Sequence, residues 1–426
     1  MFREKSHTRV QQGLLWILRI VTMSQKGENN LLLFGFTKKN VFVSMLYDVI
    51  VIGAGPAGCA AASECARQGL STLCIEEHGT IGYPVQCAGL LSNAAFAECR
   101  VSERPVLTRV SGARVVSGLG SEILIDAKTP KAVVADRGSL DREMAEAAAN
   151  SGAEFLLKTA MYSIRGTTLL TRGVNGHAEI PFRLLIAADG PRSTIARFYS
   201  MPRAKTYLAG IQVDLFHECD PRFVEIYPDA SPDFFGWMIP TGKGRVRIGL
   251  CGQSQVPERF AAFVKKYGKS ATHHVTGTLP LGLMPKTYGH RTLFVGDAAG
   301  FAKPTSGGGV YTGIRSARHA AAIAVTCCET DTFTDTALAE YEQRWRADIG
   351  RELDLGFRIF QMRQNISAHE MDALIRALSD PDIVRTIVEY GDMDRPGVLV
   401  KKLLRKPAIL RCAAPLLRSR LLSLFR

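Results

Sequence analysis

The segment from Tyr47 to Glu76 constrains the fold more than any other part of this chain. Tyr47–Ile52 is rich in valine and isoleucine, which is typical of a strand buried on both faces. The turn Gly53-Ala-Gly55-Pro-Ala-Gly58 follows at once, and then come an alanine-rich stretch over residues 59–69 and a second apolar run over 70–75. A strand, a glycine turn, a helix and a second strand in this order predict a parallel βαβ unit that binds a dinucleotide.

Each residue type in this turn has its own predicted role. Gly53 permits the tight turn, Gly55 lets the backbone approach a pyrophosphate, and Gly58 lets the helix pack close to the strand. Ala57 lies in the same turn and is assigned to the cofactor site with them. The positive end of the helix dipole favours a diphosphate there. Glu76, 18 residues after Gly58, is placed to accept hydrogen bonds from ribose hydroxyls, and its charge disfavours a 2′-phosphate.

Two further apolar runs end in acidic residues. Residues 184–188 lead into Asp189-Gly190, and residues 291–295 lead into Gly296-Asp297. The glycine-rich segment Pro304–Gly313 and an alanine-rich helical stretch follow the second acid. In this order and spacing, the three motifs resemble the FAD-binding fold shared by aromatic hydroxylases, flavin halogenases and geranylgeranyl reductases.

This resemblance implies that FAD is the cofactor. A carboxylate at a strand's end can hold ribityl hydroxyls, which suits Asp297, and backbone amides at the next helix start can stabilise negative charge on a flavin, which suits Gly308 and Gly309. The resemblance also implies that Arg137 lies near the adenosine half of FAD. Taken alone, Asp297 could be an ordinary helix cap and Arg137 a surface residue. The predicted cofactor site further includes Cys87, Ala88, Asp189 and Val310.

The predicted fold class is α/β with an α+β second domain. A Rossmann-like FAD-binding domain of the aromatic-hydroxylase type would comprise residues 45–200 and 286–330, and an antiparallel substrate sheet would comprise 201–285. Strands are expected there at Leu208–Leu215, Phe223–Tyr227, Phe234–Ile239 and Gly244–Cys251. Residues 331–426 are expected to be helical with a basic tail. Residues 1–44 are expected to be a disordered arm or the product of an upstream start assignment.

An aromatic segment, Phe234-Phe235-Gly-Trp237-Met-Ile239-Pro240, lies within the predicted substrate sheet. It could be a core strand that ends at proline. It also resembles the aromatic-x-Trp-x-Phe-Pro signature of geranylgeranyl reductases, with Ile239 in place of phenylalanine, and the Trp-x-Trp-x-Ile-Pro signature of flavin halogenases. Halogenases need a lysine after the nucleotide-binding unit, and no lysine occurs between Met45 and Lys128. This absence disfavours halogenation.

A second segment, Pro84-Val-Gln-Cys87-Ala88, favours the reductases. It resembles the Pro-Val-x-Cys-Ala segment that lies by the isoalloxazine ring in archaeal geranylgeranyl reductases. That branch often carries an acidic residue where Gly89 stands and glycine where Leu90 stands, so this chain departs from the pattern. The resemblance covers roughly residues 45–390.

The implied activity is reduction of isolated double bonds in geranylgeranyl chains, in the archaeal branch those of digeranylgeranylglycerol phospholipids. An isolated alkene accepts hydride poorly, so the site must combine hydride delivery, proton donation and a dry apolar tunnel. Phe235 and Trp237 are predicted to line the tunnel and stabilise positive charge on the substrate. Cys87 is predicted to position or protonate the alkene, and its alternative is a thiol that only packs against the flavin. No metal site is predicted.

The basic residues of this chain are concentrated at its ends. The net charge is +13, of which residues 1–44 carry +5 and residues 395–426 carry +9, so the remainder is close to neutral. This distribution disfavours nucleic-acid binding and favours either an anionic membrane surface or a helical subdomain with a solvated basic face. Ten irregularly spaced cysteines indicate a reducing compartment. The expected location is therefore the cytoplasm, peripheral to the membrane.

Two other functions remain open at this point. An FAD-dependent aromatic monooxygenase would use the same FAD motifs, and an electron-transfer flavoprotein would pass electrons to a membrane partner without converting a lipid. There is no second complete glycine motif for a separate nicotinamide domain and no compact Cys-x2-Cys-x2-Cys motif. The electron donor of the predicted reductase is external, either ferredoxin or a reduced nicotinamide.

Overall fold

A computed structural model describes residues 40–42, 45–268, 272–364 and 366–410. The predicted N-terminal arm, apart from residues 40–42, and the last sixteen residues of the basic tail, 411–426, lie outside the described residues. The chain divides into two compact units, Met1–Val41 and Phe42–Arg426, and the second contains every predicted site residue. The description below concerns this second unit.

The predicted dinucleotide unit is present with almost the expected bounds. It consists of β2 (Tyr47–Ile52), α2 (Pro56–Arg67) and β3 (Thr72–Ile75). The strands β2 and β3 are parallel, and side chains such as Val49 and Val51 are completely buried, as a strand covered on both faces requires. The α/β prediction for this part of the chain is confirmed.

The rest of this parallel sheet comes from distant segments. The strands β9 (Glu154–Leu156), β12 (Gly176–Ala187) and β19 (Thr292–Phe294) pair in parallel with β3, β2 and β12, respectively. The antiparallel strands β10 (Ala160–Arg165), β11 (Thr168–Gly173) and β18 (Tyr288–Gly289) extend it at β12 and β19. The helices α4 (Arg137–Asn150) and α7 (Val310–Glu329) pack on α2. The carboxyl ends of β2, β12 and β19 therefore meet at one edge, where the glycine turn, Asp189 and Asp297 follow them.

A second sheet has the strand order β17-β13-β16-β15-β14-β6-β7. Its bounds are β6 (Gly112–Val116), β7 (Glu122–Asp126), β13 (Thr206–Phe216), β14 (Phe223–Tyr227), β15 (Gly236–Gly242), β16 (Arg245–Gly252) and β17 (Thr272–Leu281). It is mostly antiparallel, but β6 and β14 are parallel. Because β6 and β7 come from residues 112–126, this sheet includes a segment that the sequence assigned to the FAD-binding part. The strand expected at Phe234–Ile239 begins only at Gly236.

Smaller elements connect the two sheets. A short sheet of β4 (Leu90–Ser92), β8 (Ala132–Ala135) and β5 (Val106–Val110) lies next to α3 (Asn93–Cys99). The short helices are α5 (Thr194–Phe198), η1 (Pro228–Ala230), α6 (Val256–Val264), η2 (Lys265–Tyr267) and η3 (Gly296–Ala299). The nine cysteines among the described residues are free thiols.

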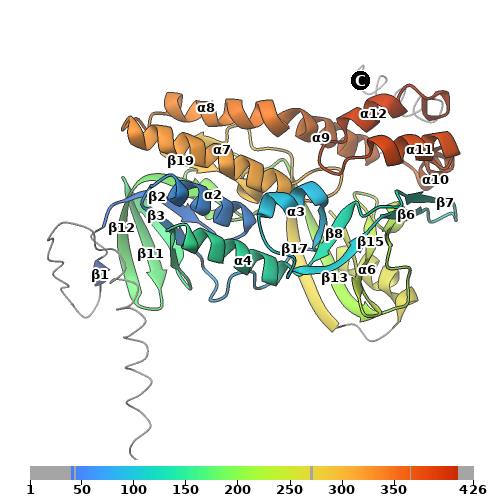
Figure 1. The fold of residues 1–426 in the computed structure, drawn as a ribbon, viewed down its shortest axis with the longest axis horizontal. Helices are drawn as coiled ribbons and strands as arrows, with labels where there is room; N and C mark the ends of the chain where they lie inside the picture. The colour runs from blue at the N-terminus through green and yellow to red at the C-terminus, as the bar shows by residue number, and fades with distance from the viewer. Residues whose placement is uncertain (1–39, 43–44, 269–271, 365, 411–426) are drawn as a thin grey trace, which may run out of the picture. The chain divides into compact units, whose positions relative to one another are not determined.

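The C-terminal part is helical, as predicted. It contains α8 (Asp335–Trp345), the π-helical turn η4 (Arg346–Gly350), α9 (Arg351–Arg363), α10 (Ala368–Leu378), α11 (Pro381–Tyr390) and α12 (Gly397–Leu403). Figure 1 shows α7 and α8 side by side, with α9 to α12 continuing toward β6 and β7. Tyr341 and Trp345 anchor α8 because both are fully buried and donate hydrogen bonds, to Phe294 O at 2.6 Å and to Thr287 Oγ1 at 2.9 Å.

Candidate functional site

The glycines of the first turn are required for two different reasons. A Cβ on Gly53, whose φ is 101°, would lie 2.4 Å from Ala188 O, and a Cβ on Gly58 would lie 1.8 Å from Gly53 O. Backbone packing therefore excludes a side chain at both positions. Gly55 has no neighbouring atom within 4 Å of its Cβ position. The space beside Gly55, at the start of α2, is where a pyrophosphate is expected to lie.

Glu76 organises the same turn through contacts within the protein. Its Oε2 accepts a hydrogen bond from Ala54 N at 2.9 Å, and its Oε1 accepts one from His78 N at 2.9 Å and contacts His78 Nδ1 at 2.7 Å. A carboxylate oxygen can accept two hydrogen bonds, so Oε2 retains capacity for a ribose hydroxyl. The predicted ribose contact is compatible with this arrangement.

Asp297 lies where α7 begins and close to the second glycine-rich segment. A Cβ on Gly309 would lie 2.8 Å from Asp297 Oδ1, so a glycine is needed for the carboxylate to approach the helix start. Burial raises the pKa of Asp297 to about 6, and the nearby charge of Arg137 partly offsets this effect. Within the described residues no group donates a hydrogen bond to this carboxylate, which leaves its acceptors available for the ribityl hydroxyls of FAD.

The neighbours of Asp297 pack without space for larger side chains. The Ala57 methyl group lies 2.9 Å from the Cβ position of Gly296 and 3.4 Å from that of Gly313. Ala57 therefore sets the close approach of α2 and α7. This role is additional to its predicted contact with the cofactor. Val310 is the first residue of α7 and is 9% exposed, and Gly309 precedes it as the N-cap.

Asp189 combines a structural contact with an unsatisfied oxygen. Its Oδ2 accepts hydrogen bonds from the backbone N–H groups of Thr194 at 2.7 Å and Ile195 at 3.1 Å, at the start of α5. Its Oδ1 is buried and has no partner among the described residues, and burial raises the pKa of this carboxyl. Two carboxylates with available acceptor oxygens, beside Gly53 and Gly309 respectively, fit the hydroxyl groups of FAD.

Arg137 lies between groups that the sequence assigned to different parts of FAD. Its guanidinium binds Asp141 through two hydrogen bonds of 3.0 Å. Burial acts to lower the pKa of Arg137, but Asp141 and the Cys87 thiol outweigh this effect and raise it. The sequence placed Arg137 near the adenosine half, whereas its neighbours here are Cys87 and Asp297, assigned to the ring and to the ribityl chain.

The Cys87 segment is held by side chains of the second sheet. Gln212 Nε2 donates a hydrogen bond to Cys87 O at 3.0 Å, and Arg247 Nη1 donates one to Ala88 O at 2.8 Å. Arg247 is itself fixed by two hydrogen bonds to Asp214, of 2.7 and 3.0 Å. The Cys87 Sγ accepts a weak hydrogen bond of 3.4 Å from Gly89 N.

Sequence analysis did not identify Gln212, Asp214 or Arg247. The available signal was the alternation in Ile211-Gln-Val-Asp-Leu215, which places Gln212 and Asp214 on the same face of β13, opposite Val213. Gln212 is only 5% exposed and contacts the loop directly, whereas Asp214 acts on it through Arg247. Buried polar residues of this kind need partners, and here the partners include the backbone carbonyls of the Cys87 segment.

Gly89 explains part of the departure from the archaeal pattern. Its φ is 79°, and a Cβ there would lie 2.3 Å from Ala135 O and 3.3 Å from Arg247 Nη1. This loop conformation therefore excludes an acidic side chain at position 89. An acidic residue at this position requires a different loop conformation.

The aromatic segment lies close to the Cys87 segment. Phe235 and Trp237 are half-buried, with ring centroids 6.2 Å apart in an edge-to-face arrangement, and Phe235 stacks on Phe234 at 4.3 Å. Trp237 packs against the same apolar cluster as Ala88, built around Ile239 and Val134. The structure thus brings together two segments that are about 150 residues apart in the sequence.

A glycine and an arginine of the C-terminal helices set the surroundings of the aromatic segment. A Cβ on Gly249 would lie 2.5 Å from Trp237 Cζ2, so this glycine makes room for the ring. The indole N–H is buried and has no acceptor among the described residues. Arg363, at the end of α9, donates hydrogen bonds to Phe234 O and Pro228 O and so connects the aromatic segment to the C-terminal helices.

An open cavity lies between the start of α4 and the second sheet. Its volume is about 320 Å³. Its lining includes Tyr83, Val85, Arg137, Asp214, Arg247 and His273. The cavity reaches the Arg137 and Arg247 groups that fix the Cys87 segment, and its size is within the range of small-molecule sites.

Comparisons with known proteins agree with this geometry. Residues 48–169 match the FAD dependent oxidoreductase family. Digeranylgeranylglycerophospholipid reductase 2 of Methanothermobacter thermautotrophicus is 31% identical over 82% of this chain and 98% of its own length. This chain belongs to the geranylgeranyl reductase family. As a family member it is an FAD-dependent oxidoreductase, and the carboxylates and glycines described above fit that cofactor.

Solved structures show the same fold. A geranylgeranyl bacteriochlorophyll reductase-like protein from Thermoplasma acidophilum aligns with a TM-score of 0.79 at 22% identity, covering 87% of this chain and 99% of its own. The p-nitrophenol 4-monooxygenase of Pseudomonas putida aligns with a TM-score of 0.64 at 14% identity, covering 82% and 97%. Reductases and monooxygenases therefore share this architecture, which confirms the predicted fold class but does not distinguish their reactions.

Proposed function

We propose that this geranylgeranyl reductase family member saturates the C=C bonds of geranylgeranyl chains on a digeranylgeranylglycerol phospholipid, in membrane lipid synthesis. The observation that carries the proposal is that the Cys87 segment packs in the same apolar cluster as Trp237, while Arg137 lies near both Cys87 and the predicted cofactor residue Asp297. The near full-length similarity to a named digeranylgeranylglycerophospholipid reductase supports the choice of substrate.

The chemistry assigns separate tasks to these residues. Reduced FAD supplies the hydride for one alkene carbon, and the other carbon must receive a proton. The faces of Phe235 and Trp237 stabilise positive charge on the substrate and exclude water. The Cys87 thiol positions the alkene or donates the proton, and Gln212 and Arg247 hold its backbone in place. Arg137, held by Asp141, interacts with the Cys87 side chain.

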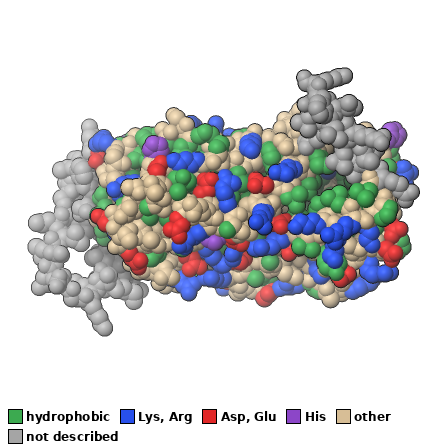
Figure 2. All heavy atoms as spheres, turned by 90° about the horizontal axis from the view of Figure 1, so that it is seen from above, with side chains coloured by type: hydrophobic (Ala, Val, Ile, Leu, Met, Phe, Trp, Pro, Cys, Tyr) green, Lys and Arg blue, Asp and Glu red, His purple; other side chains and the backbone are tan. Residues whose placement is uncertain are grey.

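The C-terminal helices are the proposed site of membrane contact. No helix in the described ranges is both long and apolar enough to cross a bilayer. Val398, Leu404 and Leu410 are exposed apolar residues near the exposed cations Lys401 and Arg405. Figure 2 shows basic and apolar side chains interspersed on the face that carries these helices. An anionic bilayer surface matches this combination, and it is where the phospholipid substrate is located.

The proposed electron donor is an external carrier, either ferredoxin or a reduced nicotinamide. The proposed location is the cytoplasmic side of the membrane. Both proposals follow from the substrate, because a lipid-bound chain must be reached at the bilayer surface and the flavin must be reduced again after each turnover.

An anaerobic single-turnover experiment tests the function. The purified holoprotein is reduced with dithionite, excess reductant is removed, and a geranylgeranylated phospholipid is added in vesicles. We expect the flavin to reoxidise and the lipid to gain mass in steps of two hydrogens. The fully saturated phytanyl lipid serves as the control and should leave the flavin reduced. The contrary result is a flavin that stays reduced with the lipid but is reoxidised by oxygen while an aromatic compound is hydroxylated. That result would identify a monooxygenase.

A further inference from the structure

The turn that presents Gly308 to the cofactor site is built around a buried lysine. Lys303 N donates a hydrogen bond to Gly308 O at 3.0 Å, and Lys303 O accepts one from Gly307 N at 2.8 Å. The Lys303 side chain folds back under this turn, so that its Cε lies 3.1 Å and its Nζ 3.5 Å from the Cβ position of Gly308. Lys303 is only 7% exposed. A positive charge therefore lies directly behind the glycines predicted to contact the flavin.

The ion-pair partner of Lys303 is Asp394, which lies between α11 and α12. Asp394 is 4% exposed, and its Oδ1 lies 2.5 Å from Lys303 Nζ. Lys303 Nζ also donates a hydrogen bond to Met393 O at 3.0 Å. The other carboxylate oxygen of Asp394 accepts a hydrogen bond from the hydroxyl of Ser92, five residues after Cys87. One carboxylate thus holds the lysine of the glycine turn and the strand that follows the Cys87 segment.

Residues 392–396, here called the junction loop, are fixed on both sides of Asp394. Asp392 Oδ1 accepts hydrogen bonds from the N–H groups of Asp394 at 2.7 Å and Arg395 at 3.0 Å. The Arg395 guanidinium binds Asp348 Oδ1 at 2.9 Å and the Tyr311 hydroxyl at 3.4 Å. The junction loop is therefore attached to α7, which begins at the glycine turn.

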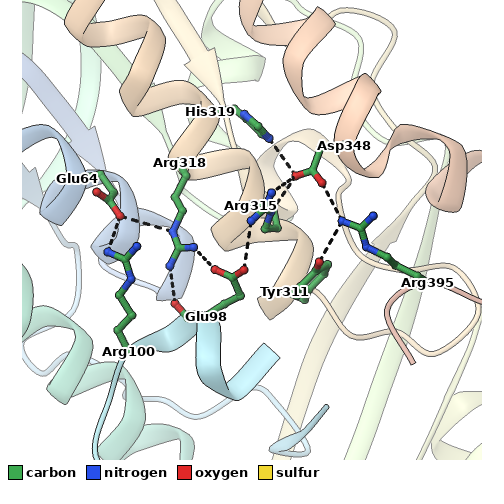
Figure 3. A network of polar contacts seen from close by, with 9 residues as sticks. All are labelled: Glu64, Glu98, Arg100, Tyr311, Arg315, Arg318, His319, Asp348 and Arg395. Atoms are coloured by element: carbon green, nitrogen blue, oxygen red, sulfur yellow. Dashed lines mark hydrogen bonds and ion pairs between the residues drawn. The ribbon is translucent and has the colours of Figure 1, made fainter. Parts of the chain in front are cut away.

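Figure 3 shows the charged contacts that surround this attachment. Asp348, on the π-helical turn η4, also accepts hydrogen bonds from Arg315 at 2.8 Å and contacts His319 Nε2 at 3.0 Å, and both residues belong to α7. Arg315 continues to Glu98 on α3, to which Arg318 is also bound. The junction loop, η4, α7 and α3 thus share one network of charged contacts around the glycine turn.

We propose that Asp394 and Lys303 are positioning residues that set the electrostatic potential at the flavin. The inference rests on the placement of FAD beside Gly308 and Gly309. A buried ion pair presents no net charge, whereas either member alone would present a full charge in a medium of low polarity. The positive charge of Lys303 behind the glycines stabilises the anionic reduced flavin relative to the oxidised one. The negative charge of Asp394 offsets part of this stabilisation. The pair therefore tunes the reduction potential, as well as the shape of the turn.

A double-mutant cycle on the full-length holoprotein tests this inference. The midpoint potential of bound FAD is measured by dye equilibration for Asp394→Asn, Lys303→Met and the double variant. We expect a more positive potential in Asp394→Asn, a more negative one in Lys303→Met, and a value close to wild type in the double variant. Asp382→Asn, the same change at an exposed position of α11, should leave the potential unchanged.

Shifts of opposite sign are the signature that a purely structural role would not produce. Shifts of the same sign, or none, would overturn the inference even if both variants lose activity. If Asp394→Asn yields no folded protein, Lys303→Met is compared with the double variant, since these differ only in the charge of residue 394. The potential is measured without lipid, so a protein that fails to reduce the lipid but shows these shifts refutes the proposed substrate and leaves this inference intact.

Discussion

The two sides of the candidate site are built in different ways. On the cofactor side, short contiguous motifs shape the backbone, and Gly53, Gly58 and Gly309 are needed because a Cβ would meet a neighbouring atom. On the substrate side, side chains from distant elements hold loops by their carbonyl oxygens, as Gln212, Arg247 and Arg363 do. The first kind of site is visible in the sequence, and the second becomes visible only when the chain has folded.

The strongest test of this comparison substitutes two glycines of the same turn. Gly58→Ala places a methyl group 1.8 Å from Gly53 O, so we expect a loss of several kcal/mol of stability, comparable to severe core overpacking. Gly55→Ala has free space in the protein and should fold normally, yet bind FAD at least about tenfold more weakly because its methyl group faces the pyrophosphate. Thermal unfolding of the apoprotein and FAD titration separate the two outcomes. Equal stability losses would contradict the assignment.

The next test removes a side chain from the substrate side. Arg247→Met frees Ala88 O and leaves Asp214 without its buried partner, so we expect kcat to fall by about 100-fold while FAD remains bound. Arg245→Met, on the same strand but exposed, is the matched control and should retain activity. Lipid reduction and the flavin spectrum are the measurements. If Arg247→Met instead lost FAD, and kept the wild-type kcat after FAD was added back, Arg247 would belong to the cofactor side. The distinction between a cofactor side and a substrate side would then fail.

Asp297→Asn tests the cofactor side through pH. Burial raises the pKa of Asp297 to about 6 in the folded apoprotein, whereas in the unfolded chain this carboxyl loses its proton at lower pH. The free energy of unfolding therefore falls as the pH rises from about 4 to about 6. Asparagine does not ionise, so the variant does not lose stability in this way. Relative to the wild-type apoprotein, its free energy of unfolding should be up to about 3 kcal/mol higher at pH 8 and the same near pH 4.

The same variant should bind FAD about tenfold more weakly at pH 8, since the ribityl hydroxyls lose a charged acceptor. Calorimetry at both pH values and FAD titration are the measurements. A stability gain that does not depend on pH would show that the carboxylate is not the cause.

Cys87→Ser tests the chemical role of the thiol with a smaller expected effect. We expect about a tenfold loss of lipid reduction with unchanged FAD binding, because serine keeps the size of the side chain but is a weaker acid. Cys251→Ser, at a buried thiol of β16, is a control for general effects of the substitution. Unchanged turnover in Cys87→Ser would identify Cys87 as a packing thiol.

Membrane contact should respond least to single changes. Lys401→Gln is expected to lower binding to anionic liposomes about fivefold, because one basic residue near the surface contributes about 1 kcal/mol, and to leave the reduction of detergent-solubilised lipid unchanged. Lys131→Gln, exposed before β8, is the control. Equal binding of both proteins in a co-sedimentation assay would show that α12 does not contact the bilayer.

The sequence predicted the elements in which periodicity and glycine spacing are local. The strand Tyr47–Ile52 was predicted to the residue, and Phe223–Tyr227 likewise. The aromatic strand begins later than expected, at Gly236, because Gly236 pairs with Tyr227 and Phe234 turns instead into a stack with Phe235. The inclusion of β6 and β7 in the second sheet was not predicted, because strand pairing between distant segments leaves no local pattern.

What the sequence determined by itself is the cofactor unit, since a glycine turn between apolar strands and an acid at each strand's end act within a few residues of one another. The sequence alone also showed that the Cys87 and Trp237 segments resemble those of geranylgeranyl reductases. Only the tertiary structure decided which polar groups meet: Arg137 with Cys87, Arg247 with Ala88, and Asp394 with Lys303. These pairs join elements far apart in the chain. They are fixed by burial, because a buried charge or carbonyl must find a partner wherever the fold brings one within reach.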